Sequence, residues 1–225
     1  MRLDFVSAGA AHGLVAAIAA GNGVEVAGSF GAVGAMLEKF NAGEACDVVI
    51  LTHAQIADLA SKGAVIESSV ADLGAAPTAI AVRAGEALPK VSDAPSLRAA
   101  LLAADAIYFP DPARATAGIH FAKVLDRLGL AAEVAARVRT FPNGATAMKA
   151  MGEAAGHPIG CTQATEILAV ASVRLVAPLP KGFDLATVYT AAVNARAAHR
   201  AEAEAFAKAL TGAQSLAARK AAGFE

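Results

Sequence analysis

The sequence predicts an α/β fold with largely parallel sheets. Segments with strand-like and helix-like patterns alternate along the 225 residues, and a hydrophobic fraction of 56% is sufficient for a substantial core. Apolar, β-branched runs such as Asp47–Leu51 are typical of strands that are buried on both faces. Helical segments such as Ala54–Lys62 end at a glycine, here Gly63. The length allows one large domain or two lobes of about 100 residues each.

The expected strands are short apolar runs, and several of them lead into turns rich in glycine or alanine. They cover residues 3–7, 24–29, 47–51, 78–83, 106–109, 159–162, 173–177 and 187–193. The expected helices show amphipathic spacing, and several have proline before them or glycine after them. They cover residues 13–20, 35–41, 54–62, 96–104, 118–128, 146–151, 164–170, 201–210 and 215–222.

Composition excludes several classes of protein. The formal net charge is −1 and no basic patch stands out, so a nucleic-acid binder is not expected. No uncharged apolar run reaches the roughly 18 residues of a membrane span. Cys46 and Cys161 lie far apart in strand-like contexts, which favours two buried thiols over a disulfide. No cluster of cysteine and histidine indicates a metal site, and we expect no cofactor.

The first residues bear on localisation. Met1-Arg2 leads straight into the expected strand Leu3–Ser7, whereas a secretory signal would place a basic region and an apolar segment before it. Either a signal was removed and the protein is periplasmic, or the native protein is cytoplasmic. The sequence as given favours a cytoplasmic location.

Four loops that lie between a strand or an extended segment and a helix are made mostly of small residues. They are Ala8–Gly13, Phe30–Gly34, Asp111–Gly118 and Phe141–Thr146. Small residues let a ligand approach the backbone, and the first turn of a helix offers free N–H groups and a partial positive charge. A single loop of this kind is explained by a tight strand–helix turn. Four in one chain favour a cradle for an anion.

The order of these motifs resembles the molybdate-binding proteins of ABC transporters, nearly from end to end. The resemblance begins with Leu3–Gly13 and Ser29–Ala35, and it continues through Gly43–Ile50 and Ala79–Val82. Thr116-Ala117-Gly118, Leu125–Gly129 and the closing Ala221–Phe224 are similar to the loop, helix and ending of the second half of that family. Each motif alone is only weakly specific for that family, but the whole set in this order is highly specific.

The resemblance implies a two-lobed, type II periplasmic-binding fold with two sheets flanked by helices. Lobe 1 would contain residues 1–80 and 186–225, and lobe 2 would contain residues 81–185. A ligand would lie in the cleft between the lobes, which would close by hinge motion.

The chain departs from the family at three positions where the resemblance implies ligand contacts. The family has serine hydroxyls in the first two loops, where this chain has Ala10 and Val33, and Gln163 replaces a tyrosine. Loss of hydroxyl donors leaves a tetrahedral oxyanion less well satisfied, so we expect an organic carboxylate in place of molybdate. The expected ligand contacts are Gly9, Ala10, Ala11, His12, Gly31, Ala32, Val33, Thr52, Arg114, Thr116, Ala117, Gly118, Asn143, Gly144, Ala145, Thr162 and Gln163.

Three ionisable side chains have two interpretations each. Arg114 is either a bidentate clamp for a carboxylate or a solvated loop residue. His12 is either a ligand contact or acid/base group, or a solvent-facing residue at a helix start. Glu166, where the family often has aspartate, is either a catalytic candidate or a helix cap.

Two functions remain open. The first is a binding protein for a small anionic solute, which would partner an ABC permease if it is exported. The second is a cytosolic isomerase of an unsaturated di- or tricarboxylate such as aconitate, a reaction that needs a base near the substrate carbon. The missing signal peptide favours the second, because a transporter's binding protein must be exported, and the absence of an unmistakable acid and base pair in the sequence favours the first.

Overall fold

The computed structural model describes residues 1–225, and they separate into two compact units. Unit 1 contains Met1–Ala76 and Val188–Glu225, and unit 2 contains Pro77–Thr187. We expected lobe boundaries near residues 80 and 185. Strands β4 (Ala71–Arg83) and β9 (Ala186–Val193) each contain one of the two unit boundaries.

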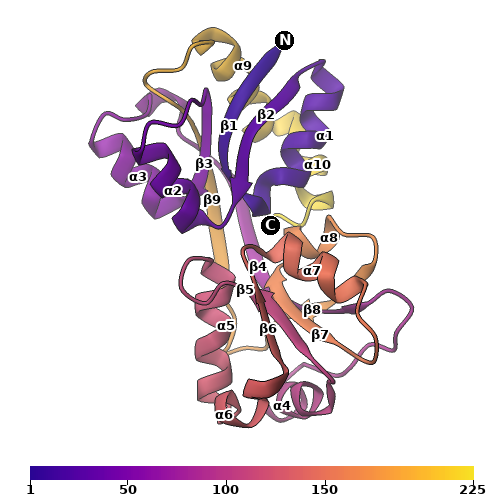
Figure 1. Cartoon of the computed structure of the whole chain (residues 1–225). Helices are drawn as coiled ribbons and strands as arrows, with labels where there is room; N and C mark the ends of the chain where they lie inside the picture. The colour runs from indigo at the N-terminus through magenta and orange to yellow at the C-terminus, as the bar shows by residue number, and fades with distance from the viewer. The chain divides into compact units, whose positions relative to one another are not determined.

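Unit 1 is built on parallel strands with one antiparallel neighbour. Strands β2 (Glu25–Gly31), β1 (Arg2–Ala8) and β3 (Val48–Thr52) are parallel, and β9 pairs with β3 in the opposite direction, from Val48↔Val193 to Thr52↔Tyr189. Its helices are α1 (His12–Asn22), α2 (Val33–Asn41), α3 (His53–Ser61), α9 (Arg200–Thr211) and α10 (Leu216–Ala221). Helices α2 and α3 lie on one side of these strands, and α1 and α10 lie on the other (Figure 1).

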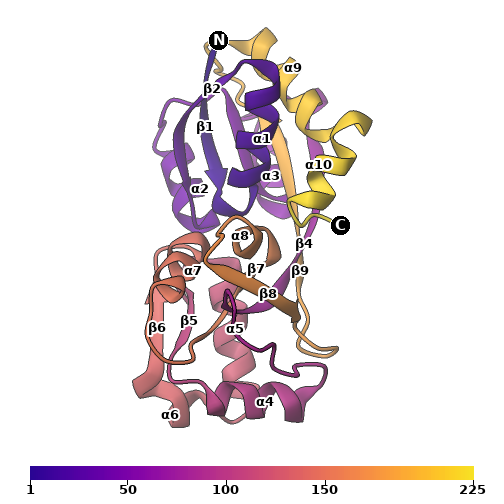
Figure 2. The same cartoon turned by 90° about the vertical axis from the view of Figure 1, so that its right-hand side faces the viewer.

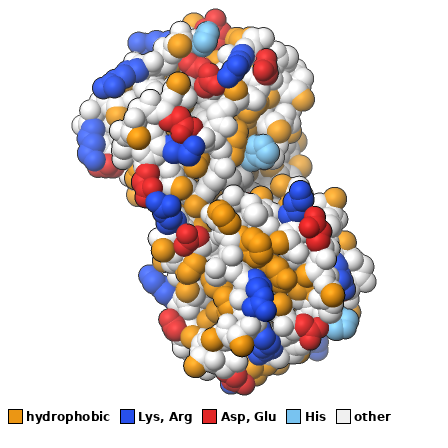
Figure 3. All heavy atoms as spheres, in the orientation of Figure 1, with side chains coloured by type: hydrophobic (Ala, Val, Ile, Leu, Met, Phe, Trp, Pro, Cys, Tyr) orange, Lys and Arg blue, Asp and Glu red, His pale blue; other side chains and the backbone are white.

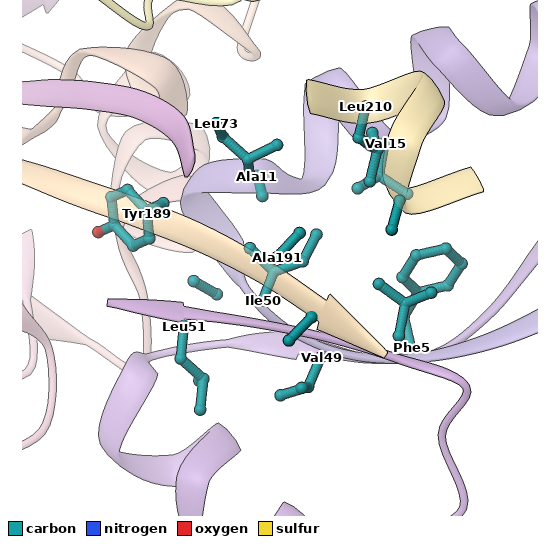
Figure 4. Packing of buried hydrophobic residues seen from close by; sticks show 14 of the residues in the cluster. Phe5, Ala11, Val15, Val49, Ile50, Leu51, Leu73, Tyr189, Ala191 and Leu210 are labelled. Carbon is teal, nitrogen blue, oxygen red and sulfur yellow. The ribbon is translucent and has the colours of Figure 1, made fainter. Parts of the chain in front are cut away.

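The core of unit 1 explains this arrangement. Val48, Val49, Ile50 and Leu51 of β3 are fully buried, because helices cover both faces of the strand. Alternate side chains therefore enter different layers, and Ile50 points toward the layer that holds Val15 and Leu210, whereas Leu51 points away from it (Figure 4).

Unit 2 has a mixed sheet. Strand β5 (Ile107–Pro110) is parallel to β6 (Val138–Phe141) and β7 (Ile159–Gln163), and β4 pairs antiparallel with β7 and β8 (Val173–Pro178). The helices of unit 2 are α4 (Ala94–Ala103), α5 (Thr116–Arg127), α6 (Ala131–Val134), α7 (Gly144–Gly152) and α8 (Ala164–Leu168). Figure 2 shows α4 and α6 at the end of the unit that lies away from α7 and α8.

Two hydrophobic clusters fill unit 2. One packs Leu97, Phe121 and Leu130 with β5, and the other packs Met148, Met151 and Ile167 with β4. The two clusters line opposite faces of the same strands, which is the layer arrangement expected of an α/β unit.

The predicted α/β fold class is confirmed, with two differences in detail. The sheets are mixed instead of largely parallel, because β4, β8 and β9 run against their neighbours. Strand β6 and the first seven residues of β4 were not expected. The sequence Val138-Arg139-Thr140-Phe141 carries two polar residues and is only partly buried, so it lacks the apolar run of a central strand.

One carboxylate joins the two ends of the chain within unit 1. Asp47 is 2% exposed, and its oxygens accept the backbone N–H groups of Asp4 at 3.1 Å and His199 at 3.0 Å. Burial by itself raises the pKa of Asp47, but these hydrogen bonds outweigh burial and hold the pKa below its ordinary value. The fold therefore stabilises the ionised carboxylate of Asp47.

Replacement of Asp47 by alanine should destabilise the protein. Two backbone donors lose their buried acceptor, and the expected loss of unfolding free energy is about 1–3 kcal/mol. Urea denaturation of Asp47→Ala measures this loss. Asp58→Ala is the control, because the exposed Asp58 pairs only with Lys62 at the surface. Equal effects of the two variants would contradict the structural role of Asp47.

Candidate ligand-binding site

The ligand contacts predicted in unit 1 lie at the carboxyl edge of its parallel strands. Because β1, β2 and β3 are parallel, the loops that follow them meet at one edge of the sheet. The first loop is the 3₁₀ turn Gly9–Ala11, which leads into α1 at His12. Residues 31–33 join β2 to α2, and Thr52 joins β3 to α3.

The first turns of α1 and α2 lack a side-chain cap. The capping positions are Ala11 and Ala32, which have no side-chain acceptor for the first N–H groups of either helix. The N–H of His12 already donates to the Gly9 carbonyl, so the remaining N–H groups of these turns and the helix dipoles are what an anion could contact. Ala10 and Val33 are buried and apolar, so they add no hydroxyl.

Thr52 and His12 make different interactions: Thr52 forms a hydrogen bond, and His12 forms a ring contact. The Thr52 hydroxyl donates to Oε1 of Gln55 at 2.8 Å in the capping box of α3. The His12 ring is exposed and lies against Phe30, with ring centroids 4.6 Å apart. Thr52 therefore stabilises a helix start, and His12 presents a polar edge beside the first two loops.

In unit 2, the loop before α5 is shaped by close packing. A Cβ atom at Gly118 would lie 2.3 Å from the carbonyl oxygens of Pro110 and Asp111, so only glycine fits. The Asp111 carboxylate accepts the N–H of Ala113 at 2.7 Å. Arg114 is exposed on this loop, and Thr116 opens α5 after Ala115, which provides no side-chain cap.

The start of α7 is occupied by the protein itself. Gly144, which the sequence assigned to the ligand, donates its N–H to Oε1 of Glu166 at 3.1 Å. The Thr162 hydroxyl donates to Oε2 of Glu166 at 2.6 Å, and Asn143 accepts from the N–H and the hydroxyl of Thr146, each at 2.9 Å. An internal carboxyl group thus takes the place that we expected a ligand carboxylate to take.

Glu166 is therefore a buried helix cap, the second of its two interpretations. It is 7% exposed, and burial raises the pKa of its carboxyl group, although hydrogen bonds from Thr162 and nearby amides oppose the shift. A Cβ atom at Gly144 would lie 2.0 Å from both Thr162 Oγ1 and Glu166 Oε2. Substitution of Gly144 would disturb this cap and unit 2 as a whole.

A second polar cluster in unit 2 is incompletely paired. Gln163 is 2% exposed and donates its Nε2 to Thr187 Oγ1 at 3.3 Å, but its Oε1 has no hydrogen-bond partner. Thr78, opposite Gln163 in the β4–β7 pair, and Thr165, two residues further on, also have buried hydroxyls without a partner. We call Thr78, Gln163, Thr165 and Thr187 the Gln163 cluster.

Sequence reasoning found Gln163 but missed the three threonines around it. No motif marks them, since Thr78 lies on β4, Thr165 on α8 and Thr187 on β9. Unpaired buried polar atoms are rare in folded proteins, because each costs about 1–3 kcal/mol. Thr78 Oγ1, Gln163 Oε1 and Thr165 Oγ1 therefore stand out as buried polar atoms without a partner inside the protein.

A separate cavity lies in unit 1. A hollow of about 420 Å³ at the amino edge of the unit 1 sheet is lined by Cys46, Asp47, Asn194 and neighbouring residues. Its buried polar groups are already paired, since Asn194 donates to the Cys46 carbonyl at 2.9 Å and Asp47 accepts two N–H groups. Burial raises the pKa of the Cys46 thiol to about 11, so this thiol is not a nucleophile at neutral pH.

Comparison with known proteins decides the family. A profile of bacterial extracellular solute-binding proteins matches residues 6–225. The chain belongs to this family. The predicted resemblance to solute-binding proteins of ABC transporters is thereby confirmed, and the family description does not support the cytoplasmic location that we expected. No helix of this family member has the length and apolar character needed to span a membrane.

Solved structures share the fold. The periplasmic molybdate-binding protein of Azotobacter vinelandii is 21% identical, with a TM-score of 0.76 over 99% of this chain and 98% of that chain. PEB3, a protein of Campylobacter jejuni, was solved with bound L-phospholactate and is 17% identical, with a TM-score of 0.66 over 99% of each chain. The two-lobed α/β class predicted from the sequence is the fold of these proteins.

A curated relative is an enzyme. The aconitate isomerase of Pseudomonas sp. is 29% identical over 164 residues, which are 72% of this chain. The aligned part covers 60% of the isomerase.

The structure predicts an unusual pH dependence for Glu166→Gln. A raised carboxyl pKa means that the folded state holds its proton more tightly than the unfolded state, so this contribution to stability is lost as pH rises above the ordinary carboxyl range. Glutamine remains neutral and keeps an oxygen for the Gly144 N–H. The unfolding free energy of Glu166→Gln relative to the parent should therefore increase as pH rises above the ordinary carboxyl range.

Denaturant titrations across this pH range test the prediction, with the exposed Glu202→Gln as the matched control. The control should track the parent at every pH. A Glu166→Gln protein whose stability difference from the parent stays constant would show that the buried carboxyl is ionised throughout.

Proposed function

We propose that the protein binds a small organic acid, in preference to molybdate, and delivers it to an ABC permease. The carrying observation is the Gln163 cluster, which offers an unpaired amide oxygen together with unpaired hydroxyls. A fully deprotonated tetrahedral oxyanion has acceptors only and would leave Gln163 Oε1 unpaired. An organic acid with a hydroxyl or an un-ionised carboxyl group also provides a donor.

The apolar residues Ala10 and Val33 support the same choice. Both are buried at the carboxyl edge of unit 1, where a hydroxyl would strengthen the hold on an oxyanion. The uncapped N–H groups of α1 and α2 suit a carboxylate equally well.

As the resemblance implies, we propose that both units contribute to holding the ligand. The hinge would involve β4 and β9, which contain the boundaries Ala76–Pro77 and Thr187–Val188. Arg114 and the first turn of α5 at Thr116 would contact a carboxylate of the ligand.

Thermal-shift screening tests the ligand class. Citrate and malate, which carry a hydroxyl group, should stabilise the protein, and molybdate, tungstate and sulfate should have little effect. A ligand at a hundredfold its dissociation constant adds about 2.7 kcal/mol to the unfolding free energy, which is readily seen as a shift in Tm. A strong shift with molybdate and none with any organic acid would overturn the proposal.

Gln163→Leu tests the site. The variant should bind the best organic acid at least about tenfold more weakly, because it removes the polar partner of the ligand. The stability of the ligand-free protein should change by less than about 1 kcal/mol, since one hydrogen bond and one unpaired oxygen disappear together. Calorimetric titration and denaturation measure the two effects, with the exposed Gln214→Leu as the control.

A second candidate function is isomerisation of an unsaturated tricarboxylate. The observation that favours it is the sequence similarity to the Pseudomonas aconitate isomerase. Conversion of trans-aconitate to its cis isomer, followed by proton NMR, tests this activity directly.

A further inference from the structure

Two histidine–aspartate pairs flank strand β3 in unit 1. At its amino end, His199 Nδ1 lies 3.5 Å from Asp47 Oδ2. At its carboxyl end, His53 Nδ1 lies 3.0 Å from Asp72 Oδ1. The histidine side chains are similarly exposed, at 53% and 60%. Only the His53 pair lies at the edge where the loops after β1 and β2 also end.

The His53 pair is held by a third side chain. The buried hydroxyl of Thr190 donates to Asp72 Oδ1 at 2.5 Å and lies 3.4 Å from His53 Nδ1. Partial burial raises the pKa of Asp72, but the hydrogen bonds from Thr190 and His53 outweigh burial and lower it overall. Asp72 is thus kept as a carboxylate that accepts a proton-bearing Nδ1.

This geometry fixes the chemistry of the imidazole ring. When Nδ1–H is donated to Asp72, the neutral ring carries its lone pair on Nε2. A histidine that is oriented in this way by a carboxylate is a suitable general base. The Asp47 carboxylate, by contrast, is already committed to two backbone N–H groups.

We propose that His53 is a proton-transfer residue for a bound unsaturated carboxylic acid and that Asp72 and Thr190 are its positioning residues. The proposal deepens the isomerase function suggested above and rests on it. His53 Nε2 removes a proton from a methylene carbon between a carboxylate and a carbon–carbon double bond. The C–H electron pair spreads over the three allylic carbons, and Nε2 returns the proton to the far allylic carbon. The double bond shifts by one position, and no oxidant or reductant is consumed.

The uncapped first turns of α1 and α2 fit this role. They lie at the same edge and would stabilise the negative charge that the allylic anion delocalises onto its carboxylates. Thr52, the residue before His53, fixes the start of α3 through its capping box with Gln55. The backbone of His53 is therefore held in place.

The experiment uses the whole protein and trans-aconitate in deuterated water. Proton NMR follows both formation of the cis isomer and loss of the methylene signal through exchange. His53→Ala should lower both rates at least a hundredfold, and added imidazole should restore part of the exchange. His199→Ala, the matched control at the other end of β3, should leave both rates within twofold of the parent.

Asp72→Asn and Thr190→Val test the positioning role. Each should lower the exchange rate at least tenfold while trans-aconitate still shifts the Tm of the variant. A failed positioning role would appear as exchange rates equal to that of the parent in both variants.

Measurement of trans-aconitate binding distinguishes failure of the proposed binding function from failure of the proposed role of His53. If trans-aconitate and other organic acids leave the Tm of the parent unchanged, the proposed binding function fails, and the role of His53 fails with it. If trans-aconitate binds but the parent shows neither exchange nor conversion, or His53→Ala retains the parent rates, binding stands and the His53 proposal is wrong.

Discussion

Strand β9 returns along β3 in the antiparallel direction, and the organisation of unit 1 depends on this pairing. Five residue pairs, from Val48↔Val193 to Thr52↔Tyr189, join the C-terminal part of the chain to its first 76 residues. The pairing brings Thr190 beside His53 at one end of β3 and His199 beside Asp47 at the other. It also supplies hydrogen-bond partners for one edge of the fully buried β3.

In unit 2, the start of helix α7 is stabilised by a side chain of the protein and not by a ligand. The N–H of Gly144 is satisfied by Glu166, whose carboxylate also accepts the Thr162 hydroxyl. A carboxyl group inside the protein replaces the external anion that such a loop could bind. Burial of Glu166 carries a desolvation penalty, which appears as its raised pKa. Hydrogen bonds from Thr162 and nearby backbone amides partly offset this penalty.

With the start of α7 filled, the Gln163 cluster is the part of unit 2 that we propose for ligand recognition. Each of its three unpaired buried atoms carries a desolvation cost of about 1–3 kcal/mol. Unit 1 differs, since its uncapped helix starts offer positive potential without any charged side chain. Acidic and basic side chains are intermixed over the face shown in Figure 3, which agrees with a net charge of −1 and with anion binding through local dipoles instead of a basic surface.

The sequence by itself determined the α/β class, most helices and strands, and the small-residue loops before α1, α2, α5 and α7. These features depend on local hydrophobic periodicity and on small residues at turns, which are legible along the chain. The tertiary structure decided which polar groups meet. Glu166 reaches back 22 residues to Gly144, and His53 meets residues 19 and 137 positions away in Asp72 and Thr190. Such contacts arise from strand order and direction, and no local pattern records a hydrogen bond between residues that only the folded sheet brings together.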